Sequence, residues 1–509
     1  MKKNFFDFRK MISCLLVLSS LVVCCSCSST NKYNYSAMDG GFAPMEAGVN
    51  YSMNADSYYE GSESYTEITE NSFINTSENN KSYFSIDANT SSYPNLRSLL
   101  ANRTAVYPDA VRIEEMLNYF NYNYNTPENG DILALNASVF DNPYNGETKL
   151  LTIGLAAKEV EFKNIKNNLV FLIDTSGSMY SPDKLPLVQQ AFTMLAENLN
   201  PDDRVSIVTY AGSAGVALEG AYGKDKLKIT AVIEDLQAGG STAGSEGIET
   251  AYKIASKYFI KGGNNRVILA TDGDFNVGIN STSELEKFIS KKKESGVYFS
   301  VFGVGRGNLK SDIMETLALK GNGTAGYIDS VKEAKRALVE QIGGTMVTVA
   351  KDVKSGVVFN SDIVESYRLV GYENKLLTEE QFNDSTTDAG ELGSGHTVTV
   401  VYEIKLKEGA DLSDDGEVAK VTLRYKDVDA NEENRELDLS VSTSAYHKEM
   451  TDNDKFISSV VEFGLILRES DYRADASLSA LAERLRGLDL SSDEYKNEFK
   501  SLVLQYADR

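Results

Sequence analysis

The sequence predicts a doubly wound, Rossmann-like α/β domain that is inserted in a β-sandwich-like domain and followed by a helical segment. Three observations support this prediction. Short apolar runs alternate with helical patterns between residues 166 and 345, which is typical of a mostly parallel sheet covered by helices. Strand-like runs lie on both sides of that region, and helical patterns return after residue 449.

The amino terminus has the pattern of an export signal. MKKNFFDFRK is basic, and MISCLLVLSSLVV is an apolar stretch that is too short to cross a bilayer comfortably. The segment VVCCSCSST that follows resembles a bacterial lipoprotein signal, in which the first cysteine after cleavage carries the lipid. Because Ser26 satisfies the requirement for a small residue, we expect removal of residues 1–26 and lipidation of Cys27, with Cys25 as the alternative. The lipid would anchor the protein to a membrane of the cell envelope.

The chain before the central domain divides into a tether and a structured region. Residues 27–82 are rich in Ser, Asn, Tyr, Gly and Glu without hydrophobic periodicity, which is typical of a flexible, disordered tether. Residues 83–165 carry strand and helix patterns, ending in the strand-like runs ILALNASVF and KLLTIGLAA. In PDAVRIEEMLNYFNY, one helical face consists of Val111, Ile113, Met116, Leu117 and Phe120.

The region from residue 166 to residue 345 alternates strands and helices. The predicted order begins with LVFLID, the helix KLPLVQQAFTMLAENL, RVSIVTYA, the antiparallel edge strand GVALEG, a helix near residues 225–236 and the helix EGIETAYKIASKYF. RVILAT, ELEKFISKKKE, YFSVFGV, LKSDIMETLAL, AGYI and KEAKRALVEQI continue the alternation. In EGIETAYKIASKYF, the side chains expected to face the core are Ile248, Ala251, Tyr252, Ala255 and Phe259.

Residues 346–448 predict a β-sandwich-like domain, and residues 449–509 predict helices. VAKDVKSGVVF, SYRLVGY, HTVTVVYEIKL, AKVTLRYKD and ELDLSVST are strand-like, with the alternation of a sheet that has two different faces. We expect the strands near residues 130–157 to join this sandwich, so that the central domain is an insertion. KFISSVVEFGLILRES, LSALAERLRG and EYKNEFKSLVLQY form the helical end.

The main candidate site is the string DTSGSM at the end of the apolar run NNLVFLID. Asp174, Ser176 and Ser178 alternate along one short turn and offer hard oxygen ligands. A hard divalent cation such as Mg²⁺ takes oxygen ligands and keeps some of its waters. Thr242 in AGGSTAGS and Asp272 at the end of RVILATD would complete the cage. An open parallel sheet binds ligands beyond the carboxyl ends of its strands, which is where both aspartates are expected.

These residues resemble the metal-ion-dependent adhesion site of a von Willebrand factor type A domain, covering about residues 166–345. The motif of that family is Asp-x-Ser-x-Ser, a distant Thr and a distant Asp, and all five positions match here. The resemblance implies that a divalent cation is ligated, directly or through water, by Asp174, Ser176, Ser178 and Thr242. It implies that Asp272 acts through a water, and that an acidic side chain of a partner protein takes the open position.

The same resemblance leaves the identity of the cation and the surrounding residues open. We expect Mg²⁺, with Mn²⁺ or Ca²⁺ as alternatives. Asp274 and Asn276 lie just past Asp272, where they would either orient the ligands or face solvent.

The flanks carry a second resemblance. SIDANTSSYPNLR, AVRIEEMLNYFNY, VAKDV, YRLVGYEN and FISSVVEFGLILRES resemble a bacterial family of exported proteins, over roughly residues 83–509. In that family a type A domain lies between specific N-terminal and C-terminal regions. The resemblance implies this architecture and no defined reaction or partner.

Composition and spacing argue against several other functions. The formal net charge of −23 argues against nucleic acid, which needs clustered Lys and Arg. LIDTSGS is not an aspartic protease turn, because Ser176 intervenes before Gly177 and no second copy is present. FGVGRGN lacks the dinucleotide-binding spacing and predicts a tight turn. All four cysteines lie within the first 27 residues, so cleavage at Cys27 leaves no pair for a disulfide.

The sequence therefore predicts a non-enzymatic, envelope-tethered protein that binds a protein partner through a divalent cation. One alternative is a structural module for envelope assembly, in which the metal only braces loops. A second alternative is a metal-assisted hydrolase, for which the sequence offers no clear base beside the metal.

Overall fold

The α/β domain is built on a mostly parallel sheet. The computed structural model describes residues 63–240, 244–273, 282–307, 309–410, 412, 416–428 and 433–509, which belong to one compact unit. The described strands pair in the order β10 (Ala325–Ile328), β9 (Tyr298–Val304), β8 (Asn264–Thr271), β5 (Asn167–Asp174), β6 (Arg204–Tyr210) and β7 (Ala214–Tyr222). Each neighbouring pair is parallel except β6 and β7. The predicted antiparallel edge strand is therefore confirmed.

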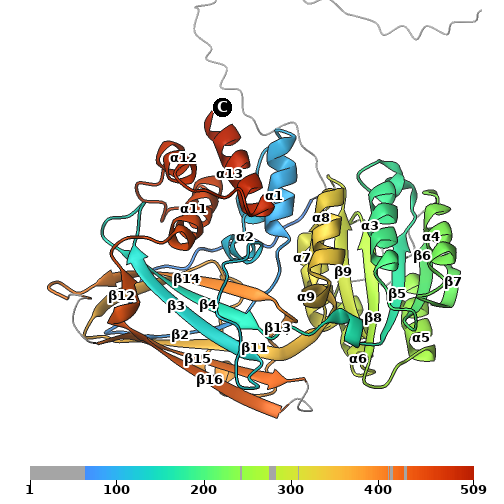
Figure 1. Ribbon diagram of the computed structural model, residues 1–509, viewed down its shortest axis with the longest axis horizontal. Coiled ribbons are helices and arrows are strands. Elements are labelled where there is room, and N and C mark those ends of the chain that lie inside the picture. The colour runs from blue at the N-terminus through green and yellow to red at the C-terminus, as the bar shows by residue number, and fades with distance from the viewer. Residues whose placement is uncertain are drawn as a thin grey trace, which may run out of the picture. The chain divides into compact units, whose positions relative to one another are not determined.

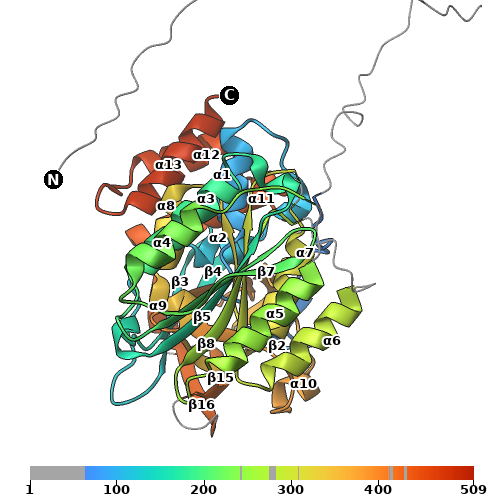
Figure 2. The same cartoon turned by 90° about the vertical axis from the view of Figure 1, so that its right-hand side faces the viewer.

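Helices cover both faces of this sheet, because its central strands are apolar throughout (Figure 1, Figure 2). On β5, Leu169 and Phe171 enter one core, whereas Val170 and Leu172 enter the other. The first core is closed by α3 (Leu185–Glu197), α4 (Lys226–Glu234) and α8 (Val331–Lys335), and the second by α5 (Gly244–Lys257), α6 (Thr282–Lys293) and α7 (Ser311–Lys320). A π-helical turn and the short α9 (Ile342–Met346) lead out of the domain.

The flanking strands form a two-sheet sandwich, as predicted. One sheet has the order β1 (Ile74–Asn75), β12 (Val364–Val370), β14 (Thr397–Leu406), β4 (Lys149–Ala157), β3 (Leu133–Asp141) and β17 (Tyr446–His447). The other has the order β13 (Gly390–Gly393), β11 (Thr348–Phe359), β15 (Glu417–Asp427) and β16 (Glu433–Ser442), with β2 (Lys81–Ser85) also paired to β11. Because β4 precedes the α/β domain and its partner β14 follows it, the α/β domain is an insertion.

A helical layer covers the outer face of the first sheet (Figure 1). It consists of α1 (Ser92–Ala101), α2 (Ile113–Asn118), α11 (Asp452–Leu467), α12 (Leu478–Arg486) and α13 (Glu494–Ala507). On β14, Val400 and Tyr402 face the sandwich core, whereas Val401 packs among the helices. The five residues of the expected helical face from Val111 to Phe120 are all buried. On the other side, the short α10 (Glu379–Asn383) contacts β2 and β11.

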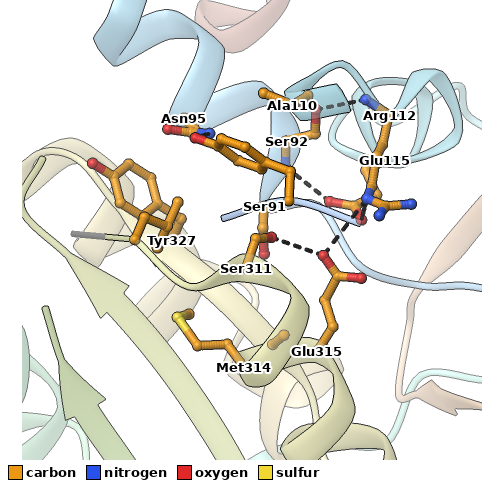
Figure 3. Close-up of a pocket in the computed structure, with 13 residues that line it drawn as sticks. Ser91, Ser92, Asn95, Ala110, Arg112, Glu115, Ser311, Met314, Glu315 and Tyr327 are labelled. Atoms are coloured by element: carbon orange, nitrogen blue, oxygen red, sulfur yellow. Dashed lines mark hydrogen bonds and ion pairs between the residues drawn. The ribbon is translucent and has the colours of Figure 1, made fainter. Parts of the chain in front are cut away.

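Two buried arginines join the helical layer to the inserted domain. Arg97 on α1 lies 2.6 Å from Asp329 and 3.0 Å from Glu333, which belong to the inserted domain, and 2.5 Å from Glu498 on α13. Arg112 lies 3.6 Å from Glu315 on α7 (Figure 3). Because these charges are withdrawn from solvent, their attraction is screened less than at the surface. The insertion is therefore held by ionic contacts as well as by its two chain connections.

The folded body begins before residue 83, contrary to the expected tether boundary at residue 82. Within residues 63–82, β1 pairs with β12, and Thr76 Oγ1 donates a hydrogen bond of 2.6 Å to the Val364 carbonyl. Glu63 accepts a hydrogen bond of 2.7 Å from the Gly307 backbone N–H. These contacts join residues more than 200 positions apart, so local periodicity does not reveal them. The remainder of the expected tether and the signal, including Cys25 and Cys27, lie outside the described residues.

The inward position expected for Phe259 is wrong. The helix α5 ends at Lys257, so Phe259 lies beyond it and its side chain is 43% exposed. The other four residues expected on that face are buried. Within the described part of the chain, no helix has both the length and the apolar character needed to span a bilayer.

Candidate metal centre

The carboxyl edge of the inserted sheet brings together the two aspartates of the predicted site. Asp174 ends β5, and Asp272 directly follows the neighbouring strand β8. The two side chains are 0% and 1% exposed, respectively. Two carboxylates buried side by side repel each other and lose hydration, so this edge attracts positive charge.

The turn after β5 gathers the hydroxyl groups. The Ser176 backbone N–H donates a hydrogen bond of 2.9 Å to Asp174 Oδ1, which folds the turn back toward the carboxylate. The Ser176 and Ser178 hydroxyl oxygens lie 3.0 Å apart. Met179 follows with its side chain fully buried in the core, whereas Tyr180 is 82% exposed. The buried Met179 side chain therefore anchors the turn to the core. The Ser176 and Ser178 hydroxyl groups lie on the turn that folds back toward the Asp174 carboxylate.

Backbone hydrogen bonds tie this turn to the loop that contains Thr242. The Gly177 N–H donates to the Gly240 carbonyl at 3.0 Å, and the Gly239 N–H donates to the Thr175 carbonyl at 2.8 Å. Thr242, Asp274 and Asn276 lie outside the described residues. The structure thus brings together Asp174, Ser176, Ser178 and Asp272, and it places the segment leading to Thr242 against the same turn.

Asp174 is held by neutral donors in a buried setting. Its Oδ2 accepts hydrogen bonds of 3.2 Å from the Tyr210 hydroxyl and of 3.2 Å from the Thr271 hydroxyl. Burial raises the pKa of Asp174 to about 6; hydrogen bonds from Ser176 oppose this rise, and the Asp272 carboxylate adds to it. A nearby cation stabilises the ionised form of a carboxyl group whose pKa burial has raised, and so lowers that pKa again.

Lys184 is a charged residue of this centre that the sequence did not reveal. Its Nζ donates a hydrogen bond of 2.8 Å to Asp272 Oδ2, and its side chain is only 10% exposed. A Cβ at Gly305 would lie 2.5 Å from the Lys184 side chain, so a larger residue there would force the lysine to shift. Gly305 and Gly307 have φ angles of +74° and +90°, which confirms the tight turn predicted for FGVGRGN.

The donor set fits a small, hard dication. Adjacent ligands of an octahedral Mg²⁺ are about 3.0 Å apart, given metal–oxygen bonds of about 2.1 Å. The separation of 3.0 Å between the two serine oxygens suits two neighbouring positions. Within the described residues, no group of three or more His, Cys, Asp and Glu side chains is arranged to hold a metal. A metal at this edge would therefore depend on hydroxyl ligands as well as carboxylates.

The fold and the sequence comparisons identify a bacterial protein with a von Willebrand factor type A domain. The sequence model described as "von Willebrand factor type A domain" matches residues 168–375, and one described as "von Willebrand factor" matches residues 59–152. Domains of this class commonly bind a divalent metal. The solved structure "von Willebrand factor type A from Catenulispora acidiphila" has a TM-score of 0.41 and 17% identity, covering 75% of this chain and 91% of its own.

The chain belongs to the family of the YfbK protein. The model for the C-terminal region of "Uncharacterized protein YfbK" matches residues 344–508. "Uncharacterized protein YfbK" of Escherichia coli (strain K12) is 36% identical over 470 residues, which cover 87% of this chain and 81% of that protein. "Uncharacterized protein sll0103" of Synechocystis sp. is 29% identical over 188 residues, which cover 36% of this chain and 43% of that protein.

Proposed function

We propose that this chain is an envelope-tethered binding protein whose type A domain captures a protein partner through a divalent cation. Type A domains are associated with protein interaction and adhesion, which supports a binding role for this chain. The observation that carries it is the convergence of Asp174, Ser176, Ser178 and Asp272 at one sheet edge. Adhesion and assembly of an envelope complex both fit this mode of binding.

Each residue of the centre has a proposed role. Asp174, Ser176, Ser178 and Thr242 would hold the cation directly or through water, and Asp272 would act through a water. Mg²⁺ is the proposed ion, supported by the oxygen ligands and the 3.0 Å spacing, with Mn²⁺ or Ca²⁺ as alternatives. A bound dication supplies a positive centre for an anion, so the matching partner group is an Asp or Glu carboxylate. Tyr180, two residues after Ser178 and 82% exposed, would contact the partner around that carboxylate.

The centre is proposed to bind rather than to catalyse. Hydrolysis at a metal requires a group that accepts a proton from the attacking water. Among the described residues, the two buried carboxylates at this edge are Asp174, which would hold the cation, and Asp272, which is paired with Lys184. The half-buried Asp183 of the same turn is paired with Arg306. Carboxylates engaged in this way are poorly placed to accept a proton from water, which favours a binding role.

Loss of the Asp174 carboxylate is expected to abolish cation-dependent capture of the partner. The wild-type protein would be immobilised and exposed to a solubilised envelope fraction in Mg²⁺, and bound proteins would be released with EDTA. Asp174→Ala should retain none of the EDTA-released proteins. Asp202→Ala is the matched control, because Asp202 is exposed and precedes β6 at the opposite edge of the sheet.

The second candidate is a structural assembly module in which the metal only braces the loops. The Lys184–Asp272 ion pair favours it, because part of the loop packing at this edge needs no metal. The same experiment separates the two functions. Capture that persists in EDTA and in Asp174→Ala contradicts the cation-dependent mechanism and supports the structural module.

The location in the envelope is proposed from the amino-terminal signal. Residues 1–26 would be removed and Cys27 would carry a lipid, with Cys25 as the alternative cysteine. Replacement of Cys27 by Ser should move the protein from the membrane fraction to the soluble extracytoplasmic fraction. Cys14→Ser, within the apolar stretch, serves as the control and should remain in the membrane fraction. Retention of Cys27→Ser in that fraction, with loss only in Cys25→Ser, would instead assign the lipid to Cys25.

A further inference from the structure

The ion pair beneath the candidate metal centre changes the charge that a cation would meet. Lys184 Nζ lies 2.8 Å from Asp272 Oδ2, and both side chains are withdrawn from solvent. Without Lys184, the carboxylates of Asp174 and Asp272 would place two negative charges at this edge. With the ammonium included, the three side chains carry one net negative charge. A dication bound there would leave one net positive charge in place of a neutral centre.

The surrounding loops are shaped to hold Lys184 in this position. Lys184 immediately precedes α3, and its aliphatic chain lies against Gly305, where a Cβ would approach Cε to 2.5 Å. The preceding residue, Asp183, lies 3.5 Å from Arg306 of the same loop. Two consecutive residues thus connect the turn after β5 with the loop after β9. This arrangement restricts the lysine to the carboxylate rather than leaving its ammonium in solvent.

We propose that Lys184 makes the metal centre depend on an anionic ligand, so that a dication and a carboxylate bind cooperatively. The inference rests on the proposed cation site and adds its regulation. The ammonium repels a dication, which weakens binding of the metal alone. The net positive charge that remains after metal binding attracts a carboxylate into the open position. Metal binding and partner binding therefore strengthen each other by the same factor, as linkage requires.

The test compares Mg²⁺ affinity with and without a simple carboxylate. Mg²⁺ would be titrated into the full-length protein in a carboxylate-free buffer, and again at a high concentration of acetate. Lys184→Met removes the charge while keeping a side chain of similar length. We expect it to bind Mg²⁺ alone at least about tenfold more tightly than wild type, which corresponds to about 1.4 kcal/mol. We also expect acetate to increase its Mg²⁺ affinity by a smaller factor than in wild type.

Two control variants separate charge from position. Lys184→Arg keeps the charge and should resemble wild type. Lys257→Met removes the same charge from an exposed ion pair with Glu219 at the far end of α5, about 20 Å along the helix from its start, and should change neither affinity. Circular dichroism would check folding. Lys184→Gln repeats the measurement if the methionine variant is unstable.

The outcomes distinguish this inference from the proposed function. The inference is overturned if Lys184→Met binds Mg²⁺ no more tightly than wild type, or if acetate raises both affinities equally. If Mg²⁺ binding by wild type is lost in Asp174→Asn yet unchanged in Lys184→Met, only the role of Lys184 fails. If neither wild type nor Lys184→Met binds Mg²⁺, with or without acetate, both proposals fail.

Discussion

Replacement of Arg97 by Met is expected to destabilise the protein by about 3 to 5 kcal/mol, the cost of breaking a buried ion pair by removing one partner. Arg97 links three elements, because its guanidinium contacts Asp329 and Glu333 of the inserted domain and Glu498 on α13. Asp329 and Glu333 have side chains only 7% and 3% exposed. Their charges would remain buried after the arginine is removed.

After replacement of Arg97, Glu333 would keep more stabilising contacts than Asp329. Glu333 keeps an ion pair of 2.9 Å with Arg336 and accepts a hydrogen bond of 2.7 Å from the Tyr119 hydroxyl. Asp329 retains a hydrogen bond of 3.0 Å from Ser330, and burial raises its pKa even with Arg97 present. Most of the expected loss therefore arises at Asp329, which would become an uncompensated buried charge.

Urea unfolding measures this effect, with Arg486→Met as the control. Arg486 is 57% exposed and lies 4.0 Å from Asp508, so removing its charge should cost less than about 1 kcal/mol. A loss for Arg97→Met that is as small as the control's loss would contradict the role assigned to this buried network. A separate early unfolding transition in Arg97→Met would show that the inserted domain has been released from the helical layer.

Replacement of Asp174 by Asn is expected to stabilise the metal-free protein at pH 7.5. Burial raises the pKa of Asp174 from its ordinary value of 3.8 to about 6. The folded state therefore binds this proton more tightly than the unfolded chain. At 1.36 kcal/mol per pKa unit, the difference between the folded-state and unfolded-state pKa values means that the ionised carboxylate destabilises the folded protein by about 3 kcal/mol.

The sign of this effect sets its dependence on pH. Below the ordinary pKa, Asp174 is protonated in both states, and its stabilising contribution is fully present. As pH rises toward the folded-state pKa of about 6, that contribution is lost, and above it the destabilisation stays constant. The asparagine side chain of the variant does not ionise, so the stability difference between the variant and wild type should grow between about pH 4 and pH 6. Chemical unfolding in EDTA across this range measures it, and a difference that is independent of pH would contradict the assignment.

The fold could be predicted because its signals are local. The continuous apolar run of β5 serves two cores, which identifies a strand buried on both faces. Alternation in β14 separates Val400 and Tyr402 from Val401, and the structure places them in different layers. Strand ends also placed Asp174 and Asp272 correctly, since neighbouring parallel strands end at one edge. The spacing of Ser176 and Ser178 then supplied the hydroxyl groups.

Features that depend on distant contacts were not predictable. Lys184 precedes a helix, and nothing local indicates that its side chain reaches Asp272, 88 positions later. The two-residue strand β1 is too short to show alternation, and only its pairing with β12 reveals it. Phe259 continues the periodicity of α5 by sequence, but the helix ends two residues earlier. In each case the sequence does not show where a helix ends or which distant residues a segment contacts.

Calorimetric titration of Mg²⁺ into the wild-type protein beside Asp174→Asn, at pH 7.5 and with acetate present, tests directly whether Asp174 holds a divalent cation. We expect saturable binding by wild type, accompanied by a higher melting temperature. We expect no saturable binding and no thermal shift in Asp174→Asn, although this variant is the more stable of the two without metal. Equal Mg²⁺ binding by both proteins, or none by wild type in the presence of the carboxylate, would contradict a cation-dependent site at Asp174.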